Sequence, residues 1–96
     1  MNSAFRKDFN WEERFVKKTK IDRYIISTVD LGINHQFLKG LPPLYYETMI
    51  FDSEDEDNNY FKDYQERYST EQQAIRGHEE TIELVKSFLG GKDEAI

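Results

Sequence analysis

The chain contains no cysteine among its 96 residues. Disulfide bonds, thiolate metal sites and cysteine nucleophiles are therefore excluded, and the composition fits a reducing compartment. Its five glycines stand singly or as the pair Gly90–Gly91, so no glycine-rich phosphate loop precedes a helix. No apolar run approaches the roughly 18 residues of a membrane span, and the N-terminus lacks the apolar stretch of a signal peptide. We therefore expect a soluble, cytoplasmic protein without a membrane partner.

Basic charge is also in short supply, with 13 Lys+Arg against 19 Asp+Glu and a net charge of -6. Direct nucleic-acid binding is disfavoured, because it depends on clustered positive charge. The charge is segregated along the chain. Residues 1–24 hold seven basic and four acidic side chains, whereas residues 47–73 hold nine acidic and two basic ones. The molecule is thus expected to be an electric dipole, with its acidic side available to a basic partner.

The first 23 residues predict a short basic helix. Asn10 is a suitable N-cap, with Glu13 three residues later as in a capping box. Trp11 and Phe15 supply a narrow apolar stripe. Three lysines near the expected end of the helix suit its macrodipole: Lys17, Lys18 and Lys20.

Residues 24–68 predict strands and an acidic loop. Residues 24–31 are rich in β-branched and aromatic side chains, and Gly32 ends this strand. Residues 44–51 predict a second strand, which we expect to pair with the first in antiparallel fashion across a link of about twelve residues. Residues 64–68 predict a third strand after the acidic loop.

An amphipathic helix is predicted over residues 69–90. Two capping boxes are available at its start: Ser69 with Gln72, and Thr70 with Gln73. The pair Gly90–Gly91 predicts its end and leaves residues 91–96 as a polar tail. Side chains at spacings of 3, 4, 3 and 4 form a stripe expected to face the sheet: Ile75, His78, Ile82, Val85 and Leu89.

A chain of this length forms a single domain, here residues 1–96. The 14 aromatic side chains are enough for a compact core. The elements together predict an α+β fold. In it, a two- or three-stranded antiparallel sheet packs on one long C-terminal helix, with a short N-terminal helix beside it.

His35 and His78 are the two imidazoles of the chain. Their spacing matches no zinc motif, so we expect no metal and no cofactor. On the apolar stripe, His78 is typical of a buried histidine hydrogen-bonded to the backbone, and a catalytic or ligand role is the alternative. His35 lies in a loop, as a turn residue or a functional contact. With Glu47, the two histidines are weak candidates for a ligand site between sheet and helix.

The acidic loop partly matches a calcium-binding template, with oxygen ligands at five of its positions: Asp55, Asp57, Asn59, Asp63 and Glu66. However, Tyr60 stands where the template needs glycine, and the preceding segment predicts a strand instead of a helix. A solvated, charge-repelled loop is therefore favoured over a calcium site.

Aromatic side chains follow the acidic loop, and Phe61, Tyr64 and Tyr68 repeat at spacings of 3 and 4. Core packing is one interpretation of this cluster. A protein-binding patch with a charged rim is the other, because aromatic residues anchor interfaces and acidic flanks steer basic partners. On the second interpretation the partner-binding residues are Asp55, Glu56, Asp57, Tyr60, Phe61 and Tyr64.

Three stretches taken together resemble a group of small uncharacterised proteins encoded by tailed bacteriophages: ISTVDLGINH (26–35), YETMIF (46–51) and RYSTEQQAIRGHE (67–79). The resemblance covers about residues 24–86 and implies a bacterial host cytosol, with no activity attached. It also gives Gly77 a meaning. Glycine inside a helix costs about 1 kcal/mol relative to alanine, which a strand or the His35 loop packed too closely for a Cβ would offset. A glycine tolerated on the helix surface is the alternative.

No arrangement of residues in the sequence indicates catalysis, so we expect no enzyme. The leading hypothesis is a small acidic accessory protein that binds a host or phage protein, as a monomer or small homo-oligomer. One alternative is an acidic mimic of nucleic acid that inhibits a DNA-binding or defence protein. The other is a small-ligand binder or enzyme that uses His35 and His78.

Overall fold

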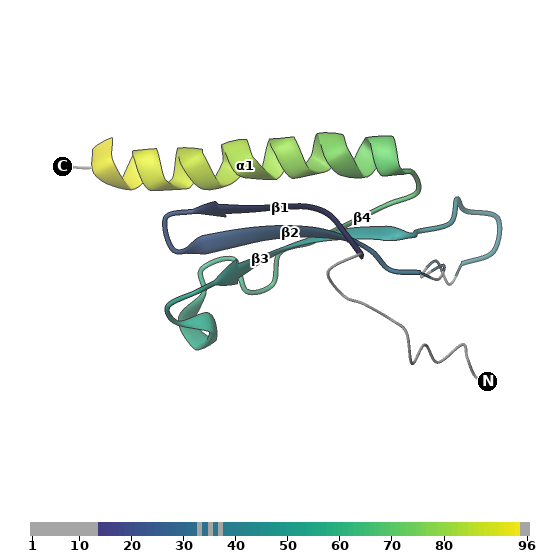
Figure 1. The fold of residues 1–96 in the computed structure, drawn as a ribbon, viewed down its shortest axis with the longest axis horizontal. Helices are drawn as coiled ribbons and strands as arrows, with labels where there is room; N and C mark the ends of the chain where they lie inside the picture. The colour runs from purple at the N-terminus through teal and green to yellow at the C-terminus, as the bar shows by residue number, and fades with distance from the viewer. Residues whose placement is uncertain (1–13, 33, 35, 37, 95–96) are drawn as a thin grey trace.

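The computed structural model describes residues 14–32, 34, 36 and 38–94, which form one antiparallel sheet and one long helix (Figure 1). The elements are β1 (Phe15–Ile21), β2 (Tyr24–Asp30), β3 (Tyr46–Asp52), the 3₁₀ turn η2 (Glu56–Asn58), β4 (Gln65–Tyr68) and α1 (Glu71–Glu94). The strand order is β1-β2-β3-β4, and α1 lies along one side of the sheet. The predicted α+β class is confirmed, but the sheet has four strands instead of two or three.

The additional strand is β1, which occupies the second half of the predicted N-terminal helix. Asp22 and Arg23 form a two-residue turn between β1 and β2, with Asp22 in the left-handed conformation (φ 56°). Such a turn returns the chain directly along itself. The pairing of β1 with β2 runs to an irregularity between Phe15 and Lys17. The helix prediction is therefore wrong for residues 15–21, where pairing with β2 outweighs the local charge pattern.

The lysines that indicated a helix end alternate between the two sides of β1. Lys17 forms an ion pair with Glu79 of α1. Lys18 and Lys20 are exposed and pair in register with β2 residues of the opposite side. Lysines on an edge strand also discourage pairing with other chains. The earlier part of the predicted helix, through residue 13 and including Asn10 and its expected cap, lies outside the described residues.

The three strands expected from the sequence are confirmed with small shifts of their ends. All seven residues of β2 pair with β3, from Tyr24↔Asp52 to Asp30↔Tyr46. A backbone hydrogen bond of 2.7 Å from Leu31 to the Tyr45 carbonyl continues this ladder toward the long link. β4 pairs with the first half of β3 and completes the sheet.

The helix α1 begins where the sequence predicts and ends later. Thr70 and Gln73 form the reciprocal capping box, with the Gln73 N–H 3.1 Å from Thr70 Oγ1 and the Thr70 N–H 3.2 Å from Gln73 Oε1. The predicted stop at Gly90–Gly91 is wrong, because α1 continues to Glu94. Glycine ends a helix by adopting a left-handed conformation, and in a helical conformation it only weakens the turn. Nowhere in the described residues is a helix both long enough and apolar enough to cross a lipid bilayer.

The core lies between α1 and the facing side of the sheet. Ile26, Ile50 and Val85 are buried at its centre. At one end Tyr24 and Phe61 pack edge to face, with ring centroids 5.3 Å apart, next to a group of partly buried residues. The predicted contact of the helix stripe with the sheet is confirmed for His78 and Val85, whereas Ile75 is exposed.

Close packing at Gly77 confirms the expectation for this position. A Cβ added there would lie 2.2 Å from the Tyr68 hydroxyl, well inside van der Waals contact. The neighbour is thus Tyr68 of β4. The glycine allows α1 to approach the sheet at the edge formed by β4.

Candidate functional site

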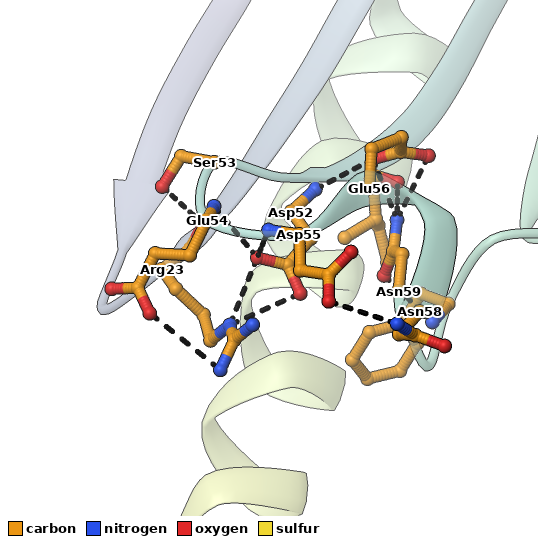
Figure 2. Close-up of polar contacts among 10 residues, drawn as sticks. Arg23, Asp52, Ser53, Glu54, Asp55, Glu56, Asn58 and Asn59 are labelled. Carbon is orange, nitrogen blue, oxygen red and sulfur yellow. Dashed lines mark hydrogen bonds and ion pairs between the residues drawn. The ribbon is translucent and has the colours of Figure 1, made fainter.

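The predicted partner-binding residues lie in and after the loop that follows β3. Figure 2 shows the part of this loop that contains Asp55 and Glu56. The loop is built around Asp52, whose side chain is buried. The single N–H of Arg23 Nε donates a bifurcated hydrogen bond to the two carboxylate oxygens of Asp52, at 2.8 and 3.0 Å. Asp52 also accepts the backbone N–H groups of Glu54 and Asp55. The hydrogen bond from Arg23 is the main reason that the pKa of Asp52 lies below its usual value, although burial opposes the shift.

Asn59 holds the other end of the loop. Its side-chain amide donates to the Ile50 carbonyl at 2.8 Å, and its side-chain oxygen accepts the Phe61 N–H at 2.8 Å. Glu56 accepts the backbone N–H of Asp52 and a bond from the Asn59 amide. Hydrogen bonds from its own polar side chains therefore organise the acidic loop, whereas the sequence predicts a solvated, charge-repelled loop.

The aromatic members of the predicted patch are divided between surface and core. Tyr60 is 69% exposed and stacks on Phe88 of α1, with ring centroids 4.4 Å apart. Phe61 is only 7% exposed, and the half-buried Tyr64 places its hydroxyl 3.0 Å from Thr81 Oγ1. Core packing thus applies to Phe61 and Tyr64. The exposed members of the predicted set are Asp55, Glu56, Asp57 and Tyr60.

The oxygen ligands of the calcium template are not assembled. Asn59 is committed to the loop backbone, and Glu66 lies on β4. Among the residues that the structure describes, no three His, Asp or Glu side chains lie close enough to hold a metal ion.

His78 lies at 0% exposure between α1 and the sheet, and both of its ring nitrogens have hydroxyl partners. Nε2 is 2.9 Å from Thr19 Oγ1 of β1, and Nδ1 is 2.7 Å from Thr28 Oγ1 of β2. Thr28 contacts Thr48 of β3, which accepts a hydrogen bond from the Tyr68 hydroxyl of β4. One chain of polar contacts therefore crosses all four strands. The expected partner of His78 was a backbone group, and the observed ones are side chains.

The order of this chain assigns the tautomer of His78. Thr48 is fully buried, so its single hydroxyl proton needs an acceptor, which Thr28 provides. Thr28 then donates to Nδ1, and the proton of the ring is on Nε2 and directed at Thr19. The imidazole is neutral in this arrangement. Burial, followed by the charge of Lys17, lowers the pKa of His78.

The predicted ligand site between sheet and helix is not assembled among the described residues. His78 is satisfied on the α1 side, whereas Glu47 precedes Thr48 on β3 and so lies on the opposite side of the sheet. There Glu47 accepts hydrogen bonds from Gln65 and Arg67. His35 lies outside the described residues.

The opposite side of the sheet carries a feature that the sequence analysis missed. We call this side the open face, because no described helix or strand covers it (Figure 1). It contains a hollow of about 300 Å³ with an almost entirely apolar lining. The lining residues come from β1, β2, β3 and the residue after β2: Phe15, Ser27, Val29, Leu31, Glu47, Met49 and Phe51.

A signal for the open face was present in the alternation of β2. Tyr24, Ile26 and Thr28 face α1, whereas Ile25 and Val29 face away from it. A strand with apolar side chains on both sides is typical of a strand covered on both sides. A single helix covers one of them.

No family model matches this chain, and neither the curated proteins nor the solved structures contain a significant match.

Proposed function

We propose that this protein is a non-catalytic binding protein that engages a protein partner through the open face of its sheet. The observation that carries the proposal is the apolar hollow of about 300 Å³ on the side of the sheet opposite α1. Hollows of this size with a mostly apolar lining are typical of binding sites in proteins. Covering this surface would remove apolar side chains such as Phe51 and Met49 from water, which favours association.

The polar groups support binding over catalysis. Both nitrogens of His78 have hydroxyl partners, and the Glu47 carboxylate accepts hydrogen bonds from Gln65 and Arg67. A general base needs a free lone pair within reach of its substrate. Within the described part of the chain, the hollow contains one acidic side chain, already engaged by Arg67, and no second titratable group.

Site-specific photo-crosslinking tests the proposal in bacterial cells, since the proposed phage origin implies a bacterial cytosol. A photoreactive phenylalanine analogue replaces Phe51 on the open face, Glu83 on α1 or Asp57 in the acidic loop. All three positions are exposed. We expect a crosslinked adduct with another polypeptide at Phe51 and none at Glu83, which serves as the matched control.

The three positions separate the alternatives. Adducts at Asp57 without any at Phe51 would support binding through the acidic loop and refute the open face. Equal adducts at all three positions would indicate random collisions. An absence of adducts at every position would refute the protein-binding function itself.

The acidic loop is the second candidate surface, because Tyr60 is 69% exposed next to the exposed carboxylates of Asp55 and Asp57. A basic partner would contact this side. Mimicry of nucleic acid gains less support. A mimic needs a row of exposed carboxylates that imitates the phosphates of a nucleic acid. Asp52 is buried in its ion pair with Arg23, so it adds no charge to such a row.

A further inference from the structure

We infer that the hollow of the open face is an anchor site for a tryptophan or tyrosine side chain carried by an acidic peptide segment of a partner protein. This inference rests on the proposed function and specifies the chemistry of the partner. It is based on the shape of the hollow, on a polar group in its lining and on the lysines beside it.

The hollow exists because a small residue lies among large ones. Ser27 pairs across strands with Lys18 on one side and Met49 on the other, and Val29 follows it on the same face of β2. The missing side-chain volume at Ser27 leaves a depression between Phe15, Met49 and their neighbours. A dry cavity of about 150 Å³ accepts benzene in other proteins. A hollow of about 300 Å³ therefore has room for an aromatic side chain.

The Ser27 hydroxyl gives the hollow a polar contact. Ser27 is 7% exposed and lines the hollow, and no described residue forms a hydrogen bond with its hydroxyl. A buried hydroxyl without a partner costs free energy, which a hydrogen bond from a ligand recovers. Tryptophan and tyrosine combine an apolar ring with one polar group and suit such a site. Phenylalanine has no polar group that could form a hydrogen bond with the Ser27 hydroxyl.

The lysines of β1 define the charge of the segment. Lys17 points toward α1 and meets Glu79, which shows how a carboxylate on a helix pairs with this strand. Lys18 and Lys20 lie on the side of the open face, and no described carboxylate pairs with either of them. Lys18 sits 5.0 Å from the centre of the Phe15 ring, at the border of the hollow. The carboxylates of an acidic segment would pair with Lys18 and Lys20 on the open face, as Glu79 pairs with Lys17 on the α1 side.

Charge and area both disfavour a second copy of the chain as the occupant. Two open faces packed together would bring Lys18 and Lys20 of each copy to one interface, where Glu47, the carboxylate in the lining, is already engaged by Arg67. Three strands of seven residues and one of four, about 4.8 Å apart, also span only about 400 Å² of flat area, less than the roughly 800 Å² that each partner buries in a standard interface. A single peptide segment suits that area better than an obligate dimer.

The test uses defined decapeptides and the full-length, ¹⁵N-labelled protein. The first peptide carries one central tryptophan among aspartate and glutamate residues. Matched peptides replace the tryptophan with phenylalanine or alanine, or replace the acidic residues with lysine. Binding is followed by the amide chemical shifts of Ser27, Val29 and Met49. We expect the acidic tryptophan peptide to shift these signals, and the alanine peptide to bind about 30-fold more weakly.

Variants of the protein separate three contributions to peptide binding: the volume of the hollow, the Ser27 hydroxyl and the charge of the lysines. Ser27→Leu fills the hollow and should weaken binding at least about tenfold. Ser27→Ala keeps the hollow and should remove only the preference for tryptophan over phenylalanine, a few-fold effect. Reversing both lysines, Lys18→Glu with Lys20→Glu, should weaken binding about tenfold at low salt and less at high salt. Arg76→Glu with Lys86→Glu, at two exposed positions of α1, has the same charge change and should have no effect.

Other outcomes overturn the inference. Equal binding of the lysine-rich peptide, or full binding by Ser27→Leu that still folds, would contradict the acidic aromatic anchor. Dimerisation that Ser27→Leu abolishes would identify a second copy as the occupant. Tighter peptide binding by Trp11→Ala would identify the N-terminal segment of the same chain as the occupant of the hollow. Crosslinks from Phe51 without any peptide binding would leave the proposed function standing and refute the anchor alone.

Discussion

His78 places a titratable side chain at the centre of the layer between helix and sheet. Its ring contacts Thr19 and Thr28 and is completely buried. Protonation would put a charge in this layer and turn Nδ1 into a donor, so that Thr28 could no longer donate to it. The neutral imidazole therefore fits these hydrogen bonds, and protonation would weaken them.

The first prediction concerns the pH dependence of stability. The unfolded chain protonates His78 near the ordinary pKa of 6.5, whereas burial lowers that pKa in the folded protein. Below pH 6.5 the unfolded state thus binds more protons. The free energy of unfolding should be constant above that pH and fall as the pH decreases toward the lower folded pKa. The slope is at most about 1.4 kcal/mol per pH unit. Urea titrations between pH 7.5 and about 5 measure it.

The second histidine supplies the control for this experiment. His35→Gln should keep the slope and His78→Gln should remove it. Asp52 and Glu79 are carboxylates with lowered pKa values, and their ordinary pKa values are 3.8 and 4.5. Their contributions to the stability of the protein are therefore lost in a more acidic range. A slope that survives in His78→Gln would contradict the assignment.

At the scale of elements, the contact between α1 and β4 depends on the absence of a side chain. Tyr68 lies against Gly77 and donates a hydrogen bond of 3.2 Å to Thr48. A methyl group at Gly77 would displace the ring and break that bond. Gly90 is also helical, and nothing lies within 4 Å of its Cβ position.

We predict opposite effects for the same substitution at these two glycines. Gly77→Ala gains about 1 kcal/mol of helix propensity but loses about 1–3 kcal/mol to overpacking, so it should lower stability. Gly90→Ala should raise stability by about 0.5–1 kcal/mol, because it meets no neighbour. Chemical denaturation of both variants provides the measurement. Stabilisation by Gly77→Ala would show that Tyr68 moves aside at no cost.

At the scale of the whole molecule, the sheet separates a covered side from an open one. Neighbouring residues of one strand therefore have different environments. Ile50 is buried against α1, whereas Met49 lines the hollow of the open face. The protein is a two-layer fold in which α1 covers one side of the sheet, and no described helix or strand covers the other.

This arrangement predicts that two adjacent positions of β3 differ in how well they tolerate a polar side chain. Ile50→Asn places an amide in the apolar core and should cost about 3–5 kcal/mol. Met49→Asn should cost about 1 kcal/mol or less, because its side chain lines an open hollow. Thermal and urea unfolding compare the two. A severe loss from Met49→Asn would mean that the open face is sealed within the monomer.

Much of the fold follows from the sequence because its cues are local. The reciprocal bonds of Thr70 and Gln73 depend on a spacing of three residues, and the alternation in β2 and β3 depends on the two-residue period of a strand. The close approach at Gly77 was one of two interpretations of an interior glycine, and the structure selects it. The sequence by itself thus determined the α+β class and most of the helices and strands.

Tertiary structure decided the rest. Phe15 to Ile21 became a strand because a turn at Asp22 placed this segment beside β2, which no local cue predicts. Phe61 entered the core through contact with distant rings, although its spacing from Tyr64 fits a surface patch equally well. Alternation shows which residues share a side of the sheet, but only the packing of α1 decides which side is covered. The open face and its hollow at Ser27 follow from that choice.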